Sequence, residues 1–312
     1  HGIQKLHLVT APRVGGAAIF VGVAAAYAAA SAEHAAILGP LWIAGCVAFA
    51  FGLLEDLTKR VPVSMRLLAT ILSGVVGWAI TGMSLHRIGQ PWVDDLLSHQ
   101  GISVLLTAFA IGGIANAINI IDGLNGLASA MKVIAFTAVA SMAYAEGDAS
   151  LAFATLSIAA AVLGFFLVNW PMGKLFLGDG GSYFGGFALA WSCVLLVERN
   201  QAVAPFAALM VCIYPFIEVL FSIYRRKVKR LSPGQPDRQH LHSLIYRRYI
   251  VTAAPTVKEN SVAGILVAML NVPPAIAAYY LKNSNFWSCM ACAGFCLGYV
   301  LIYRRVVKFS WS

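Results

Sequence analysis

The sequence is dominated by long apolar stretches that alternate with short polar segments. A helix rises about 1.5 Å per residue, so about 20 apolar residues are needed to cross a bilayer. Ten stretches approach this length, and they predict an all-α integral membrane protein with about ten transmembrane helices. They cover residues 14–32, 36–54, 65–82, 102–121, 127–145, 151–168, 182–197, 202–224, 262–280 and 286–303.

The polar segments between these stretches are too short to fold as soluble domains. The longest, 225–261, is predicted to be a basic cytoplasmic loop with a histidine-containing motif. We therefore expect residues 1–312 to form a single polytopic membrane domain. The chain starts with a polar segment instead of Met or a signal peptide, so we expect a first helix upstream of it.

Composition supports the membrane interpretation. The chain is 60% hydrophobic and only 11% charged, whereas soluble proteins are about 25% charged. This excludes a disordered chain, a coiled coil and an ordinary cytosolic enzyme. The excess of 22 Lys and Arg over 13 Asp and Glu gives a net charge of +9. In a soluble protein that excess would suggest nucleic-acid binding, but here it indicates topology, and we expect no nucleic-acid partner.

The distribution of positive charge predicts the orientation. Short loops rich in Lys and Arg remain on the cytoplasmic side of the membrane. With a cytoplasmic N-terminus, eighteen of the 22 basic residues lie inside, Arg87, Arg199 and Lys282 lie outside, and Lys132 lies within a span. The sequence thus predicts a multi-pass protein of the plasma membrane. The six cysteines are best interpreted as small buried hydrophobes, with no disulfide framework.

Acidic residues at the cytoplasmic ends of the spans are the first site candidates. Glu55 and Asp56 end the second span, Asp122 ends the fourth, and Asp179 precedes the seventh. Ionisable groups at a membrane boundary are costly and often functional. Helix caps and tight turns are the structural alternative for each of them. Adjacent residues point about 100° apart on a helix, so only one of Glu55 and Asp56 is expected to face a ligand.

Amides and glycines accompany these carboxylates. Asn119 is spaced i, i+3 from Asp122, Asn125 follows in the same segment, and Gly178 directly precedes Asp179. Carboxylates beside glycines suit Mg²⁺ that bridges phosphate oxygens, and a helix N-terminus favours an anion. This pattern favours a site for a phosphate-bearing ligand.

The segment 237–242 contains Arg238, His240 and His242 and follows a run of basic residues. The basic run alone is typical of topology or of attraction to anionic lipid. The two histidines favour contact with phosphate or sugar oxygens over zinc, because no third protein ligand is evident.

Five blocks, in this order, resemble the polyprenyl-phosphate N-acetylhexosamine-1-phosphate transferases of glycosyltransferase family 4. The likeness is greater to the GlcNAc-1-phosphate branch than to the related muramoyl-pentapeptide branch. The blocks are residues 5–16, 52–56, 116–127, 176–182 and 237–242. Together they span nearly the whole catalytic region of such an enzyme.

The resemblance implies transfer of an N-acetylhexosamine-1-phosphate from a UDP-sugar to polyprenyl (undecaprenyl) phosphate, with release of UMP. This reaction starts cell-envelope polysaccharide synthesis in the bacterial inner membrane, at a site that faces the cytoplasm. The implied cofactor is Mg²⁺, for which Mn²⁺ would substitute, with Asp179 and Asp56 as metal ligands. The implied catalytic residues are Glu55, Asp56, Asp122 and Asp179. The implied substrate-binding residues are Lys5, Arg13, Asn119, Asn125, Lys132, Gly178, Arg238, His240 and His242.

Two positions depart from the family pattern, since Glu55 and Asn125 each replace a usual Asp. Lys132 is equally explained by snorkelling toward the membrane surface. The competing function is a transporter of an anionic or lipid-linked substrate, for which Glu218 inside a span is the best support. The spacing of Gly181 and Gly185 would permit close helix contact in a homodimer.

Overall fold

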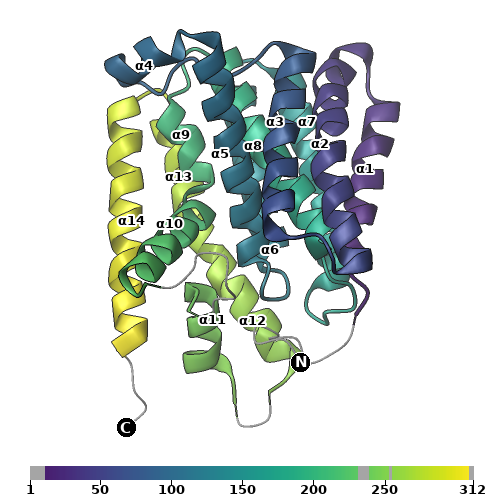
Figure 1. Ribbon diagram of the computed structural model, residues 1–312, viewed down its shortest axis with the longest axis vertical. Coiled ribbons are helices and arrows are strands. Elements are labelled where there is room, and N and C mark those ends of the chain that lie inside the picture. The colour runs from purple at the N-terminus through teal and green to yellow at the C-terminus, as the bar shows by residue number, and fades with distance from the viewer. Residues whose placement is uncertain (1–10, 231–238, 253–254, 309–312) are drawn as a thin grey trace.

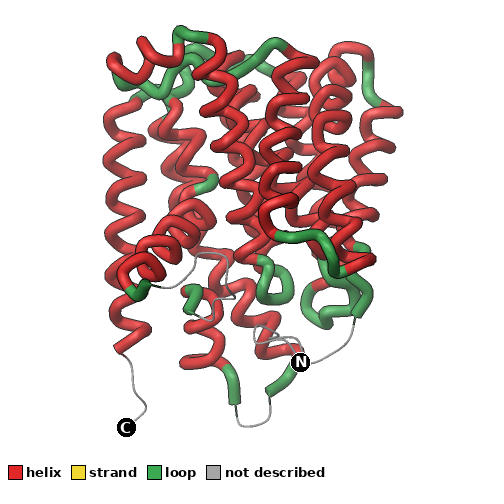
Figure 2. The backbone as a smooth tube through the Cα atoms, in the orientation of Figure 1, coloured by secondary structure: helices red, strands yellow, loops and turns green. Residues whose placement is uncertain are grey.

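The computed structural model describes residues 11–230, 239–252 and 255–308, and within these ranges the chain forms helices and no strands. Figure 1 shows the helices as one upright bundle, and Figure 2 shows the short loops that join them. The α-helices are α1 (Gly15–Ala29), α2 (Ala32–Thr58), α3 (Val63–Thr81), α4 (Pro91–Leu97), α5 (Gln100–Ile121), α6 (Leu127–Ala145), α7 (Ala149–Asn169), α8 (Gly178–Arg199), α9 (Pro205–Val211), α10 (Ile213–Val228), α11 (Leu241–Ile245), α12 (Val257–Ala268), α13 (Val272–Leu281) and α14 (Asn285–Lys308). A π-helical turn, Tyr246–Ile250, follows α11, and a 3-10 turn, Met269–Asn271, joins α12 to α13.

The all-α membrane fold is confirmed. In the described chain, eight helical segments are long and apolar enough to cross a membrane: α2, α3, α5, α6, α7, α8, Val257–Leu281 and α14. The other two predicted spans are helical but different in form. Helix α1 has only 15 residues, and α9 and α10 form a pair bent by 80°.

Local chemistry explains both differences. The first predicted span stops at Ala29 because Ser31 accepts a hydrogen bond from the His34 N–H and starts α2. The eighth breaks at Cys212, three residues before Pro215. Proline has no N–H to donate to the carbonyl four residues earlier, and its ring clashes with that carbonyl. The helix therefore ends at Val211 and restarts in a new direction.

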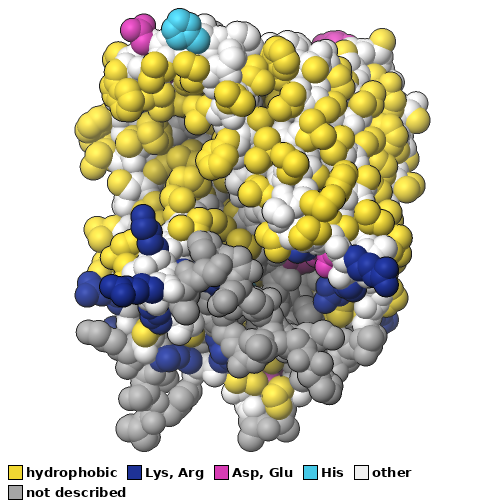
Figure 3. All heavy atoms as spheres, in the orientation of Figure 1, with side chains coloured by type: hydrophobic (Ala, Val, Ile, Leu, Met, Phe, Trp, Pro, Cys, Tyr) yellow, Lys and Arg dark blue, Asp and Glu magenta, His cyan; other side chains and the backbone are white. Residues whose placement is uncertain are grey.

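Helix α8 is the centre of the bundle. Nearly all its side chains are buried, including Phe184, Phe187 and Trp191, and it packs against α1, α2, α5 and α6. The outer face is apolar instead of polar, with exposed residues such as Leu105 (72%) and Leu167 (68%). Figure 3 shows this apolar surface over most of the bundle's height. Such a surface is stable only against lipid.

The lower end of the bundle carries the positive charge. Helix α1 begins there, α14 ends there, and α11 and α12 project below the bundle (Figure 1). Lys and Arg side chains gather at this end in Figure 3. The predicted basic loop over 225–261 contains, in its described part, the end of α10, α11, the π-helical turn and the start of α12. A capping box of Thr256 and Glu259 starts α12, and buried Leu241 and Leu244 fix α11.

Candidate active site

The candidate site is built around the turn that leads into α8, residues 176–183. The start of α1 pairs with this turn through backbone hydrogen bonds. Gly15 N–H donates to the Phe176 carbonyl (3.0 Å), Gly16 N–H to the Leu177 carbonyl (2.9 Å), and Phe176 N–H to the Pro12 carbonyl (2.9 Å). Gly178 has a left-handed φ of +74°, which glycine adopts without strain. These bonds bring the backbone of Arg13 beside Gly178.

Glycines allow α2 to approach this turn closely. A Cβ atom placed on Gly52 would lie 2.6 Å from the Cα of Gly180 and 2.7 Å from the Asp179 carbonyl oxygen. Both distances are shorter than a carbon contact tolerates. The backbone of α2 therefore rests on the first turn of α8, and the side chains one turn further along α2 are carried to the same place.

Asp56 is one of those side chains. Its Oδ2 accepts a hydrogen bond from the Gly180 N–H (2.9 Å), and its side chain is 3% exposed. Its buried Oδ1 has no hydrogen-bond partner among the described residues, although Lys59 Nζ lies 3.6 Å away. Glu55 turns elsewhere and accepts from the Val61 N–H (2.9 Å), which supports the turn into α3. Of the adjacent pair, Asp56 is thus the one that contacts α8.

Asp179 forms an ion pair with Arg66, a residue in the first turns of α3. Arg66 also lies over the ring of Tyr183, with its Cζ 5.9 Å from the ring centre. In the sequence, Arg66 is one of the basic residues that predict topology, and no motif there indicates a role for Tyr183. Arg66 follows Asp56 by ten residues, across the short polar segment between two predicted spans, which was the available signal.

The end of α5 contacts the other side of the same turn. Ser182 Oγ donates to Asp122 Oδ2 (3.2 Å), and the Tyr183 hydroxyl donates to Asn119 Oδ1 (3.3 Å). Burial raises the pKa of the Asp122 carboxyl to about 6, although Lys132 and Ser182 act in the opposite direction.

Lys132 extends from α6 into the protein and is fully buried, so snorkelling toward the membrane surface does not describe it. Its Nζ donates to the Gly181 carbonyl at 3.2 Å. Gly185 makes room for it, since a Cβ atom there would lie 2.8 Å from the Lys132 Nζ. A buried ammonium group thus lies against the first turn of α8 and near the Asp122 carboxyl.

Three predicted substrate-binding residues are not among the residues described at this turn. Asn125 Nδ2 donates to Ser261 Oγ (3.2 Å), and the Asn125 N–H donates to Asn260 Oδ1 (2.8 Å), which ties the α5–α6 turn to α12. Lys5 and Arg238 lie outside the described residues.

The two histidines stack on each other, with ring centres 5.5 Å apart. His240 Nδ1 lies 3.0 Å from Glu218 Oε1, which also accepts from the Leu241 N–H at 3.0 Å. A Cβ atom on Gly123 would lie 2.8 Å from His242 Nε2, so His242 lies beside the turn that carries Asp122. His242 is therefore close to the site, and His240 is fixed by Glu218.

The donor set suits a metal that is shared with a substrate. No group of three or more His, Cys, Asp or Glu side chains in the described ranges is arranged to hold a metal ion alone. Mg²⁺ usually binds one or two carboxylates together with phosphate oxygens and water. Asp179 and Asp56, both at the first turn of α8 and the latter with an Oδ1 that accepts no hydrogen bond from the described residues, fit this arrangement.

The fold and this cluster define a multi-pass membrane protein with a charged site at one end of its helical bundle. The family model described as "Glycosyl transferase family 4" matches residues 38–197, about half of the chain. The chain belongs to glycosyl transferase family 4, and the resemblance drawn from the five blocks is confirmed.

Similar curated proteins come from several bacteria. An undecaprenyl-phosphate alpha-N-acetylglucosaminyl 1-phosphate transferase of Yersinia pestis is 31% identical over 99% of this chain and 83% of its own length. The protein of the same name from Escherichia coli K12 is 29% identical, with the same coverage. A probable undecaprenyl-phosphate N-acetylglucosaminyl 1-phosphate transferase of Bacillus subtilis is 26% identical over 97% of this chain and 81% of its own length.

Proposed function

We propose that this protein transfers N-acetylhexosamine-1-phosphate, most simply GlcNAc-1-phosphate, from a UDP-sugar to undecaprenyl phosphate and releases UMP. Family membership and the activity named for its bacterial relatives support this assignment and do not favour a transporter. The observation that carries it is the convergence of Asp56, Asp122, Asp179, Arg66 and Lys132 on the glycine-lined start of α8.

The proposed reaction needs charge neutralisation more than a general base. A phosphate oxygen of the lipid attacks the β-phosphorus of the UDP-sugar, and the bond between the β-phosphorus and the bridging oxygen breaks, so UMP leaves. A phosphate monoester has a second pKa near 6, so the nucleophile is mostly dianionic at pH 7. The difficulty is to bring two anions together, and positioned cations and N–H groups relieve it.

The residues of the site have distinct parts in this proposal. Arg66 and buried Lys132 supply positive charge at the first turn of α8. The Gly180 N–H at the start of α8 holds the Asp56 carboxylate in place, as helix N-termini hold anions. Asp179 and Asp56 would hold Mg²⁺, or Mn²⁺ in its place, which supplies further neutralisation of diphosphate oxygens when bound.

The orientation is part of the same proposal. We place the charged end of the bundle at the cytoplasmic surface, because the excess of Lys and Arg gathers there. A UDP-sugar is a cytoplasmic metabolite class, and the phosphate of the lipid lies at the membrane surface. The site at the end of the bundle is therefore at the depth where the two substrates would meet.

The test is the nucleotide product. Purified protein in lipid nanodiscs receives undecaprenyl phosphate, Mg²⁺ and one UDP-sugar at a time from a panel of UDP-GlcNAc, UDP-GalNAc and UDP-glucose. We expect UMP release with an N-acetylhexosamine donor that depends on the lipid phosphate. Release of UDP, or turnover without lipid phosphate, would refute the proposal.

A further inference from the structure

A second charged cavity lies at the lower end of the bundle, between α10, α14 and the segment that includes α11. Its volume is about 390 Å³. Four of its lining residues are the cations Arg225, Lys229, Arg248 and Arg304, and none of the residues described as lining it is a carboxylate. Figure 3 shows dark blue side chains gathered over α10 and the lower part of α14. The cavity shares no lining residue with the site at the start of α8.

Hydrogen bonds to hydroxyl, amide and carbonyl oxygens orient three of these cations. Arg225 Nη1 donates to the Tyr303 hydroxyl (2.8 Å) and to the Gln239 carbonyl (3.0 Å), and Lys229 Nζ donates to Gln239 Oε1 (3.1 Å). Arg248 Nη1 donates to the carbonyls of Val306 and Val307, both at 2.7 Å, at the end of α14. These hydrogen bonds orient the side chains, and four cations without a carboxylate among the described lining residues make the lining positively charged.

The rim of the cavity is apolar. Tyr224 is 62% exposed and Val228 66% exposed on α10, and Val307 is 43% exposed on α14. An exposed Tyr and aliphatic side chains that line the same cavity as basic groups are typical of the boundary between hydrocarbon and headgroups. A ligand that contacts both the basic and the apolar lining residues carries a phosphate and an acyl chain. A free phosphate would use only the basic part.

We propose that this cavity binds the phosphate headgroup of an anionic phospholipid from the surrounding leaflet. Basic pockets between transmembrane helices commonly bind such headgroups. The lipid phosphate contacts the four cations, and the first part of its acyl chain lies against Tyr224 and Val228. The same wall continues to the histidine pair, because Gln239 accepts from Arg225 and the next residue, His240, is fixed by Glu218. The bound lipid thus supports the segment that positions His242 beside the site.

The experiment measures lipid retention, so it does not depend on turnover. Protein in detergent is titrated with phosphatidylglycerol or phosphatidylcholine, and bound lipid is counted by native mass spectrometry. We expect the wild type to retain one phosphatidylglycerol at concentrations where phosphatidylcholine is lost. The variant Arg248→Gln/Arg304→Gln should bind phosphatidylglycerol roughly tenfold more weakly, because two cations are removed.

The matched control is Arg305→Gln, which removes one charge from the neighbouring position of α14 but does not line the cavity. It should bind like the wild type. Equal loss in Arg305→Gln and the double variant, or no loss in either, would overturn the proposal. Displacement of phosphatidylglycerol by millimolar inorganic phosphate would also overturn it, since the site would then bind free phosphate. If the double variant does not elute as a folded protein, exposed Arg304→Gln alone serves, with a smaller expected loss.

Discussion

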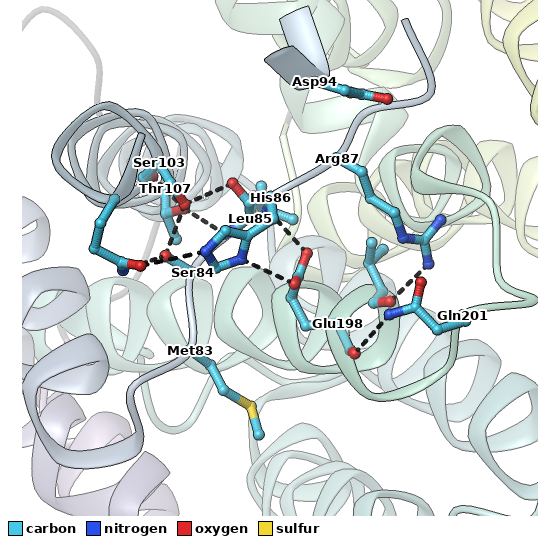
Figure 4. Close-up of polar contacts among 12 residues, drawn as sticks. Met83, Ser84, Leu85, His86, Arg87, Asp94, Ser103, Thr107, Glu198 and Gln201 are labelled. Carbon is cyan, nitrogen blue, oxygen red and sulfur yellow. Dashed lines mark hydrogen bonds and ion pairs between the residues drawn. The ribbon is translucent and has the colours of Figure 1, made fainter. Parts of the chain in front are cut away.

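The two ends of α8 carry charged residues that are used in different ways. At its C-terminal end, Arg87 Nη2 donates to three carbonyls, those of Val197, Asn200 and Val203, at 2.8 to 3.2 Å. Glu198 accepts from the His86 N–H at 3.1 Å. Figure 4 shows these side chains pointing at fixed partners in the segment between α3 and α4 and at the end of α8. These contacts fasten the segment between α3 and α4 to the end of α8 and to the segment that follows it.

At the N-terminal end of α8, carboxylates and cations from four other helices meet on one turn. Asp56 comes from α2, Arg66 from α3, Lys132 from α6, and Asp122 from the end of α5. Glycines bring the backbones together there, whereas no such glycine contact involves the Arg87 cluster. A charged residue at a membrane boundary is therefore not by itself evidence of a site. Convergence from several helices on a close backbone contact is the better criterion.

Metal removal should have the largest effect on activity, and it should act only at the N-terminal end of α8. We expect EDTA to abolish UMP release, because the diphosphate would lose its neutralising ion, and added Mg²⁺ to restore it, with Mn²⁺ as a partial substitute. The melting temperature should not change, since the described protein groups do not form a metal site by themselves. Full UMP release in EDTA would show that the reaction does not need a metal ion.

Asp179→Asn is expected to reduce UMP release by about 10³-fold, because it removes a charge at the reacting groups and a metal ligand. Asp148→Asn is the matched control. Asp148 also pairs with an arginine, Arg199, at 2.7 and 2.8 Å, but at the opposite end of the molecule. UMP release by Asp148→Asn should stay within twofold of the wild type. Similar losses in both variants would contradict the distinction between the two ends.

Gly52→Ala should lower activity by about 10-fold to 100-fold, because the new Cβ pushes α2 away from α8 and displaces Asp56. Gly164→Ala in α7 is the control, since its Cβ would meet nothing within 4 Å. Steady-state UMP release measures both variants. Wild-type activity in Gly52→Ala would mean that the close contact does not position the site.

The smallest effect is expected from Asp148→Asn on stability. Burial alone would raise the pKa of the Asp148 carboxyl. The hydrogen bonds from Arg199 and the Leu151 N–H outweigh this effect, so the pKa lies below the usual 3.8. A carboxyl whose pKa is lowered on folding stabilises the folded state above its unfolded pKa and loses that effect as pH falls through the folded value.

The variant should therefore melt a few degrees below the wild type at pH 7 and at pH 5. The difference should disappear only below pH about 4. Thermal unfolding in detergent across this range measures it. A difference that vanished already at pH 5 would show that the carboxylate does not act through this ion pair.

Most of the fold was predictable because a bilayer sets the length of an apolar helix. The sequence did not reveal the bend between α9 and α10, since hydropathy continues through Cys212 while the backbone does not. It also gave no sign of α11, five residues long, whose burial depends on contacts with α12 and α14. Short elements held by distant parts of the chain leave little local pattern.

The candidate site was partly predictable for a related reason. Asp122 and Asp179 were found because ionisable residues at span ends are rare in so apolar a chain. Arg66 was missed because its partner lies 113 residues away, and such pairing has no local signature. Asn125 was given a substrate role, but its amide contacts α12. The catalytic and substrate-binding roles themselves stay predictions.

The fate of the β-phosphate tests the central claim most directly. UDP-GlcNAc labelled with ³²P only at the β position is incubated with undecaprenyl phosphate and the protein in nanodiscs, and lipid and aqueous phases are separated. Transfer of sugar-1-phosphate predicts that the label enters the lipid while unlabelled UMP appears in water, and that Asp179→Asn leaves the label in UDP-GlcNAc. Label recovered in aqueous UDP, with an unlabelled glycolipid, would contradict the account.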